Sequence, residues 1–245
     1  MLGLPHDMWT QIFEKMEKEN EELFLYPFRK ITVNQPQMTL LTKETRPDFL
    51  SLAISILCSK SSIIPNNLSI FSNLQRLDVA GNPTWKKFPA GIEKLINLKE
   101  LYVARCELTS TSFPQELSHL TKLQVFDISG NKFSHGLSPV IGKVMTLTAL
   151  NAVECHLRFL PQELSHLSKL KELDISRNEF SQGLPPFIGQ LTALTSLSAY
   201  ECTLISLPDE LSYLSNLKEL YVSDNNFSQV PSVLKQLPTC TKVRI

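Results

Sequence analysis

Cysteine and histidine side chains that recur at regular intervals are the residues of this sequence best suited to metal or thiol chemistry. Cys106, Cys155 and Cys202 lie 49 and 47 residues apart, and His119 and His166 are separated by 47 residues. A zinc ion needs its sulfur ligands at about 2.3 Å. These side chains could therefore act together only if the elements that carry them bring them to one point.

A repeated frame of apolar residues positions these side chains. The frame is L-x-x-L-x-L-x-x-N/C, and its steps are 23 to 25 residues long. Its first leucine falls at Leu74, Leu98, Leu123, Leu147, Leu170, Leu194 and Leu217. Its closing residue falls at Asn82, Cys106, Asn131, Cys155, Asn178, Cys202 and Asn225. Degenerate copies flank these seven, at Phe49, Leu52, Ile54 and Leu57 and at Cys240, Val243 and Ile245, which predicts nine rungs.

The frame resembles the leucine-rich repeat family, in its short intracellular type. The segments that carry the resemblance are LPQELSHLSKL (160–170) and LPDELSYLSNL (207–217). Two others, NKFSHGLSPVIGKVMTL (131–147) and NEFSQGLPPFIGQLTAL (178–194), are similar to the longer plant-type repeats. The resemblance implies an α/β solenoid with a curved parallel sheet on its concave face. Short helices, 3-10 turns and loops would form its convex face.

Elementary physical chemistry supports the same architecture. The apolar residues of each frame alternate as in a strand with one buried face, and no rung can bury its apolar face alone. The closing Asn can satisfy loop backbone groups that would otherwise be buried without a partner. Asn and Cys alternate at that position, and PQELSHL occurs at 114–120 and at 161–167. The duplicated unit is therefore a pair of rungs, 47 to 49 residues long.

Residues 1–46 lie outside the repeat, and 47–245 form the predicted solenoid. Asp7 can cap a helix that presents Trp9, Ile12 and Phe13 on one face. The segment LPHDMWTQIF resembles the first helix of an F-box, the adaptor motif of ubiquitin-ligase substrate receptors. We interpret 1–46 as a helical N-terminal cap that covers the first rung. A working adaptor motif is the alternative.

This architecture separates the cysteines and histidines. Neighbouring strands lie about 4.8 Å apart, so sulfurs on alternate rungs should be roughly 10 Å from one another. An inward-facing thiol behaves as a small inert hydrophobe. The sequence also has no GxSxG, HExxH, GxxxxGK[ST] or CxxC motif. We therefore expect no metal, no cofactor, no catalytic residues and no enzymatic activity.

The concave face is the predicted partner-binding surface. Its candidate residues are Arg76, Asp78, Glu100, Tyr102, Arg105, Asp127, Asn151, Glu154, Glu172, Asp174, Arg177, Ser198, Tyr200, Glu201, Glu219, Tyr221 and Asp224. Nine of these are acidic and three are basic, a difference of minus six. The negative charge would steer a partner with a basic or mixed-charge surface, and the tyrosines would anchor it.

Composition limits the partner and the compartment. The chain of 245 residues has 24 basic and 24 acidic side chains, which disfavours nucleic-acid binding by bulk charge. Its most apolar stretch, 49–58, is shorter than the ~20 residues of a membrane span. Five widely spaced cysteines and no basic, apolar leader indicate a reducing compartment. We expect a cytoplasmic protein, located in the host cytosol if it is a secreted bacterial effector.

These observations together predict a non-enzymatic protein-binding module that is a monomer when unbound. It would act as a scaffold, or as an inhibitor that covers the working surface of a partner enzyme. An F-box-like start joined to intracellular repeats also resembles effectors of intracellular bacteria. Two alternatives stay open, a ubiquitin-ligase adaptor that uses residues 4–28 and a structural protein that self-associates through its last strand.

Overall fold

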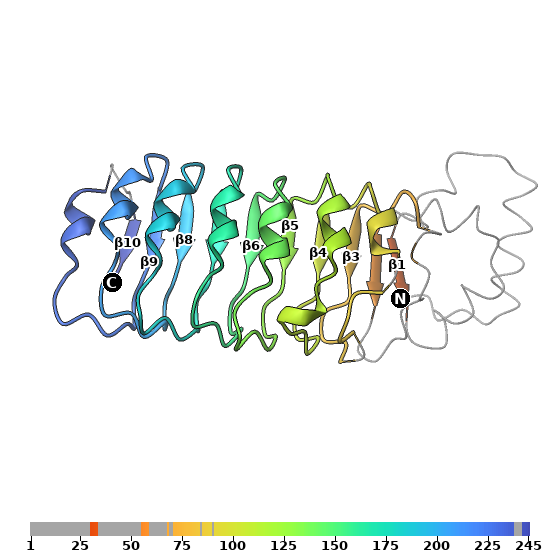
Figure 1. Cartoon of the computed structure of the whole chain (residues 1–245), viewed down its shortest axis with the longest axis horizontal. Coiled ribbons are helices and arrows are strands. Elements are labelled where there is room, and N and C mark those ends of the chain that lie inside the picture. Colours follow the sequence, from red (N-terminus) through yellow and green to blue (C-terminus); the bar gives the residue numbers. More distant parts are fainter. Residues whose placement is uncertain are drawn as a thin grey trace, which may run out of the picture.

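Ten short strands form one parallel sheet in which each strand pairs with the next along the chain. The computed structural model describes residues 30–33, 55–58, 68, 71–83, 85–89, 91–237 and 242–245, with only the backbone described at 30–33 and 55–58. The strands are β1 (Lys30–Val33), β2 (Ser55–Cys58), β3 (Arg76–Asp78), β4 (Glu100–Tyr102), β5 (Val125–Asp127), β6 (Ala149–Asn151), β7 (Glu172–Asp174), β8 (Ser196–Ser198), β9 (Glu219–Tyr221) and β10 (Lys242–Arg244). Figure 1 shows them side by side along the longest axis of the molecule.

A layer of 3-10 helices runs parallel to the sheet, as Figure 1 shows. They are η3 (Ile92–Lys94), η5 (Gln115–His119), η6 (Pro139–Lys143), η7 (Gln162–His166), η8 (Pro186–Gln190), η9 (Asp209–Tyr213) and η10 (Ser232–Lys235). A further 3-10 helix, η4 (Ser110–Ser112), lies apart from this row, at the lower edge of the view in Figure 1. Proline precedes or begins most of them, where its missing N–H costs little. In the part of the chain that the structure describes, no helix has the length and apolar character needed to cross a bilayer.

The core lies between the sheet and the 3-10 layer. The central residue of each strand from β3 to β9 is buried and both its neighbours are at least partly exposed, as alternation in a strand requires. Leu101 and Leu173 are examples, at 0% and 2% exposure. Burying one such leucine contributes about 1.5–3 kcal/mol. A solenoid of this kind is stable because the contribution repeats at every rung.

An aromatic cluster adds to the core at the N-terminal rungs. Phe113 lies at its centre, with ring centroids 5.4 Å from Phe88, 6.1 Å from Phe126 and 5.5 Å from Phe133. Trp85 packs edge-on against Phe88 at 5.9 Å. These rings come from consecutive rungs, so they join those rungs through packing as well as through the sheet.

The closing Asn and Cys residues form a continuous internal spine. Asn178 Oδ1 accepts hydrogen bonds from the backbone N–H groups of Cys155 (3.0 Å) and Leu157 (2.9 Å) in the preceding rung. The thiol of Cys155 in turn donates to the carbonyl of Ile128, 3.2 Å away in the rung before that. Asn131 and Cys106 repeat these contacts, as do Asn225 and Cys202. The spine confirms that the closing side chain satisfies loop backbone groups.

The 3-10 layer also shows the two-rung period. Gly142 of η6 lies so close to η7 that a Cβ there would be 2.2 Å from the carbonyl oxygen of Glu163. Gly189 of η8 approaches η9 in the same way, 2.3 Å from the carbonyl oxygen of Glu210. The glycines of the plant-type rungs therefore permit close packing against the rung that follows.

The sheet differs from the sequence prediction at its N-terminal end. The pairing of Ile56 with Leu77 makes Ile56 the second apolar position of its rung, whereas the sequence frame placed Leu52 there. The predicted register was thus wrong by four residues. At the other end, Val243 pairs with Leu220 and the predicted register is confirmed. A tenth strand, β1, lies within residues 1–46, which sequence analysis assigned to the cap. The predicted cap helix and F-box-like segment lie outside the described residues.

Candidate partner-binding face

The face of the sheet that points away from the 3-10 layer carries the candidate residues, and we call it the strand face. Cross-strand pairing from β3 to β10 arranges its side chains in two columns. The first column is Arg76, Glu100, Val125, Ala149, Glu172, Ser196, Glu219 and Lys242. The second column is Asp78, Tyr102, Asp127, Asn151, Asp174, Ser198, Tyr221 and Arg244. Every candidate residue of β3 to β9 therefore occupies the predicted face.

The recurrent acids of the second column have a structural role. The Oδ1 atom of Asp174 accepts a hydrogen bond from the backbone N–H of Ser176 at 3.0 Å. Asp78, Asp127 and Asn151 make the same contact two residues ahead. Asx turns of this kind end the strand, which explains why Asp or Asn recurs there. The three Asp side chains nevertheless lie on the strand face.

A charged residue with a left-handed backbone precedes the closing Asn or Cys in five rungs. These residues are Arg105, Glu154, Arg177, Glu201 and Asp224, with φ between 50° and 58°. Glycine, which adopts this conformation without strain, fills the position in two other rungs as Gly81 and Gly130. The bend interrupts the alternation of the strand. The following Asn or Cys therefore turns inward while the charged side chain stays exposed.

A tightly connected cluster surrounds Tyr102 near the N-terminal end of this face. Arg76 hydrogen-bonds Glu100 and the Tyr102 hydroxyl (3.0 Å), and it lies 3.6 Å from the Asp78 carboxylate. Its guanidinium carbon is 4.1 Å from the centre of the Tyr102 ring. Burial, together with the hydrogen bond to Glu100, raises the pKa of Tyr102 above its ordinary value. Arg76 therefore contacts two carboxylates, one hydroxyl and one aromatic ring.

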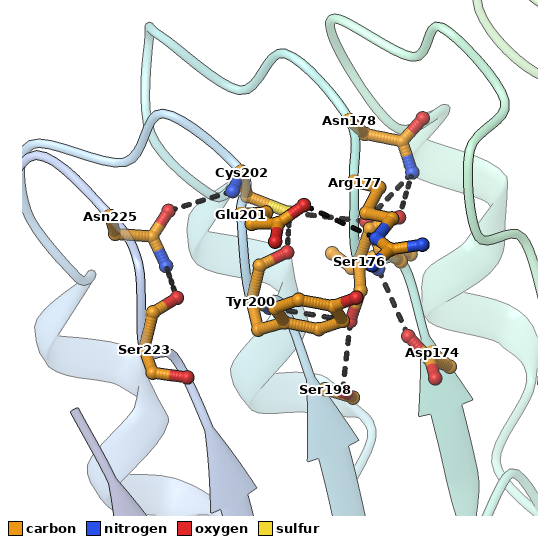
Figure 2. Close-up of polar contacts among 11 residues, drawn as sticks. Asp174, Ser176, Arg177, Asn178, Ser198, Tyr200, Glu201, Cys202, Ser223 and Asn225 are labelled. Carbon is orange, nitrogen blue, oxygen red and sulfur yellow. Dashed lines mark hydrogen bonds and ion pairs between the residues drawn. The ribbon is translucent and has the colours of Figure 1, made fainter.

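The corresponding group around Tyr200 is looser. Arg177 Nε donates to Glu201 at 3.2 Å, and its guanidinium carbon lies 5.3 Å from the centre of the Tyr200 ring. Figure 2 shows Tyr200 and Glu201 reaching from one rung towards Arg177 of the rung before. Below them the hydroxyls of Ser176 and Ser198 are 2.9 Å apart. Half of the Arg177 side chain is exposed, compared with 38% for Arg76.

A shallow pocket lies between Tyr200 and Tyr221 and has a volume of about 430 Å³. Its lining residues are Ser198, Tyr200, Tyr221, Ser223, Asp224 and Arg244. We call it the tyrosine pocket. The last strand supplies two cations to its Tyr221 wall, with Lys242 Nζ at 5.3 Å and the Arg244 guanidinium carbon at 5.6 Å from the ring centre. Each tyrosine of the strand face thus has a cation of the same chain beside its ring.

Five carboxylates of the strand face have no ion pair among the described residues. They are Asp127, Glu154, Glu172, Asp174 and Asp224. The last rung adds Lys242 and Arg244 to the three arginines counted from sequence, which leaves nine acids against five bases, or minus four. The face is therefore acidic, though less so than the minus six expected from seven rungs.

The cysteines are placed as the sequence predicted. Cys106, Cys155 and Cys202 are buried free thiols. Burial raises the pKa of Cys155 to about 12 and the pKa of Cys106 and of Cys202 to about 11. They are protonated at neutral pH and act as small core residues and weak donors. The described residues contain no group of three His, Cys, Asp or Glu side chains placed to hold a metal ion.

Two features of this face differ from the sequence analysis. Ser176, which sequence register places in an exposed column, is completely buried because its hydroxyl bonds Ser198 and accepts from the Tyr200 N–H. Lys242, Ser223 and Arg244 complete the face and were missing from the candidate residues. The register of the segment CTKVRI, which sequence analysis did assign, was the signal that could have added Lys242 and Arg244.

Comparison with known families identifies the repeat. The family model described as Leucine Rich Repeat matches residues 122–144, 169–191 and 216–237. Each matched segment contains one strand, β5, β7 or β9, and the 3-10 helix that follows it. The chain has the leucine-rich-repeat fold. Comparison with curated protein sequences gives no match.

Solved structures of other leucine-rich-repeat proteins share the fold. A leucine-rich-repeat protein of Leptospira interrogans is 28% identical, with a TM-score of 0.63 over 77% of this chain and 53% of that one. The leucine-rich repeat domain of the type III effector XopL is 22% identical, with a TM-score of 0.70 over 97% and 80%. The structure of PEPR1 with AtPEP1 is 28% identical, with a TM-score of 0.63 over 78% and 27%. The present chain thus spans about half the length of the Leptospira protein.

Proposed function

We propose that this leucine-rich-repeat protein is a non-enzymatic binding module that engages a partner protein through its strand face. The observation that carries the proposal is the set of five carboxylates without an ion pair among the described residues, spread over the rungs of β5, β6, β7 and β9 on one exposed face. Structural salt bridges would pair such charges, whereas a partner-binding surface leaves them available. A partner with a basic or mixed-charge surface fits this face.

The left-handed charged residues support the proposal. A non-glycine residue in this conformation costs roughly 1–2 kcal/mol, and strain of this kind tends to collect at functional sites. Glycine at Gly81 and Gly130 shows that the rung closes without a charge at this position. Arg105, Glu154, Arg177, Glu201 and Asp224 keep their charges despite the cost. A role in recognition accounts for them.

A related structure contains a bound ligand. PEPR1, 28% identical over 78% of the present chain, is seen with AtPEP1. By analogy we propose a protein or peptide partner here, with the module acting as a scaffold or as an inhibitor that covers a partner enzyme. The similarity to the XopL domain is a similarity of fold, and the effector role expected from the sequence is kept as part of the proposal.

Paired affinity capture with quantitative mass spectrometry tests the strand face. The intact chain is compared with a variant carrying Tyr102→Ala, Tyr200→Ala and Glu172→Lys. The matched control carries Tyr213→Ala, Ile205→Ala and Glu116→Lys, which are exposed residues away from the strand face. All three proteins are first checked for equal melting temperature.

A partner retained by the intact chain and the control but reduced at least tenfold with the first variant would support the proposal. Equal retention by all three proteins would place the binding surface elsewhere. Recovery of a ubiquitin-ligase adaptor that all three bind equally would instead favour residues 4–28 as the functional segment.

A further inference from the structure

The strand face has three tyrosines, Tyr102, Tyr200 and Tyr221. A cation of the same chain lies beside the ring of each one. Every ring has a carboxylate beside its cation: Glu100 for Tyr102, Glu201 for Tyr200 and Glu219 for Tyr221. Aromatic faces with nearby carboxylates attract guanidinium and ammonium groups. The arrangement therefore indicates that guanidinium and ammonium groups are the kind of ligand that suits these rings.

The groups around Tyr102 and Tyr200 differ in how firmly they hold their cation. Arg76 contacts two carboxylates, the Tyr102 hydroxyl and the ring at 4.1 Å. Arg177 has one carboxylate and a ring 1.2 Å farther away, at 5.3 Å. An incoming cation would have to break the whole Arg76 cluster at Tyr102. At Tyr200 the neighbouring Arg177 is loosely held, and it does not line the tyrosine pocket.

The tyrosine pocket adds room and charge at the same place. Its volume of about 430 Å³ opens beside Tyr200, and the Asp224 carboxylate in its lining has no ion pair among the described residues. Strands β7 to β10 together with the left-handed residues that follow them carry five acids (Glu172, Asp174, Glu201, Glu219 and Asp224) and three bases (Arg177, Lys242 and Arg244), a difference of minus two. The C-terminal rungs therefore combine an aromatic surface, free volume and net negative charge.

The last strand already shows how an extended basic segment meets this surface. β10 runs parallel to β9 and places both Lys242 and Arg244 beside the Tyr221 ring. A segment of another protein with similar side chains would find the same chemistry one rung away.

We propose that the tyrosine pocket binds an arginine side chain from an extended basic segment of the partner protein, with its guanidinium between the Tyr200 and Tyr221 rings and its charge facing Asp224. Arg244 is the one cation in the pocket lining, and Arg177 and Glu201 lie outside it. This inference rests on the proposed function and names the rungs and the partner chemistry.

Tyrosine-selective NMR tests the proposal with a defined probe. The chain has five tyrosines, so each ring signal can be assigned from single Tyr→Phe variants. The probe is a peptide of glycine and serine with arginine at every second position, and its control carries uncharged citrulline in place of arginine. We expect the Tyr200 and Tyr221 signals to shift with the arginine peptide, and the Tyr102 and Tyr213 signals to stay in place. Equal shifts with the citrulline peptide, or shifts centred on Tyr102, would overturn the proposal.

Three variants test the tyrosine pocket. Tyr200→Leu should weaken binding of the arginine peptide about two- to five-fold, the range of an exposed cation–π contact, while Tyr200→Phe should keep most of it. Asp224→Asn should weaken binding by a similar factor, because the pocket loses its carboxylate. Unchanged affinity of Tyr200→Leu and Asp224→Asn would refute the proposal.

The two proposals can fail separately. If a captured protein depends on the strand face but binds equally well to Tyr200→Leu, the proposed function stands and the arginine pocket is wrong. If the arginine peptide binds at Tyr200 while the partner ignores the strand-face variant, the pocket exists and the proposed function fails.

Discussion

Single amide and thiol groups connect the rungs of this solenoid. The Asn178 side chain, at 3% exposure, accepts two backbone hydrogen bonds and donates to the carbonyls of Ala152, Ile175 and Ser176. Asn225 makes the equivalent contacts but is only partly buried, so water can replace some of them. The two residues therefore offer a matched comparison of the same hydrogen bonds in different surroundings.

Asn178→Ala should lower the free energy of unfolding by about 3 kcal/mol or more, since each buried backbone group left without a partner costs about 1–3 kcal/mol. Asn225→Ala should cost less than half as much. Urea unfolding followed by circular dichroism measures both. Equal losses would show that burial does not set the strength of the spine.

The buried thiols predict a loss of stability at alkaline pH. A thiol with a folded-state pKa of about 11 or 12 stays protonated in the folded protein, whereas an unfolded cysteine ionises from about pH 8.5. Protons are then released on unfolding. Stability is thus complete below about pH 8.5 and falls as the pH rises towards the folded-state pKa, by up to about 1.4 kcal/mol per pH unit and thiol.

Urea midpoints measured from pH 8 to pH 10 check this expectation. Cys155→Ala should start from a lower midpoint but decline less steeply than the intact chain. Parallel declines in the two proteins would assign the alkaline loss to other groups.

Among the elements, η6 and η7 depend most on the absence of a side chain. The Cβ of Gly142→Ala would meet the carbonyl oxygen of Glu163 at 2.2 Å, so η6 would have to move away from η7. We expect a loss of about 1–3 kcal/mol, as for other overpacked sites. Ser165→Ala is the control, because Ser165 occupies the same position of η7 and is partly exposed. Thermal unfolding of both variants, with a loss confined to Gly142→Ala, would confirm the close packing.

The strands whose register could be predicted from sequence are those followed by a closing Asn or Cys. From β3 to β9 a closing Asn or Cys fixes which apolar residues belong to which position, and the structure confirms each register. The segment 49–58 has apolar residues at several two-residue spacings and no such marker, so its register was misread by four residues. β1 has neither leucines nor a marker and was not predicted.

Side-chain partners on the strand face could be predicted only in part. Register places Arg76 beside Glu100 and Asp78 beside Tyr102, because neighbouring strands pair residue by residue. The stacking of each cation on a tyrosine depends on the rotamers of long, exposed side chains, which periodicity does not set. For the same reason, sequence could not predict that Arg76 is held firmly and Arg177 loosely.

For the whole molecule, the exposed edge of β10 bears on the oligomeric state. All three β10 residues are exposed, and Lys242 and Arg244 flank Val243. Charged residues on an edge strand oppose pairing with a second chain. We expect this chain to be a monomer in light scattering at concentrations up to about 100 µM. This concentration is well above the dissociation constant of a specific dimer, at about 1 µM or below. A mass that rises with concentration and returns to the monomer value on Val243→Lys would support self-association instead.

The alternation of Asn and Cys also determines how such a molecule can change its length. Removing one rung would bring two asparagine rungs or two cysteine rungs together, and it would separate a plant-type glycine from the carbonyl it packs against. Removing or adding 47 to 49 residues restores both contacts. We therefore expect the solenoid to accept insertion or deletion of two rungs at a time, which would lengthen or shorten the strand face without changing the contacts of the interior.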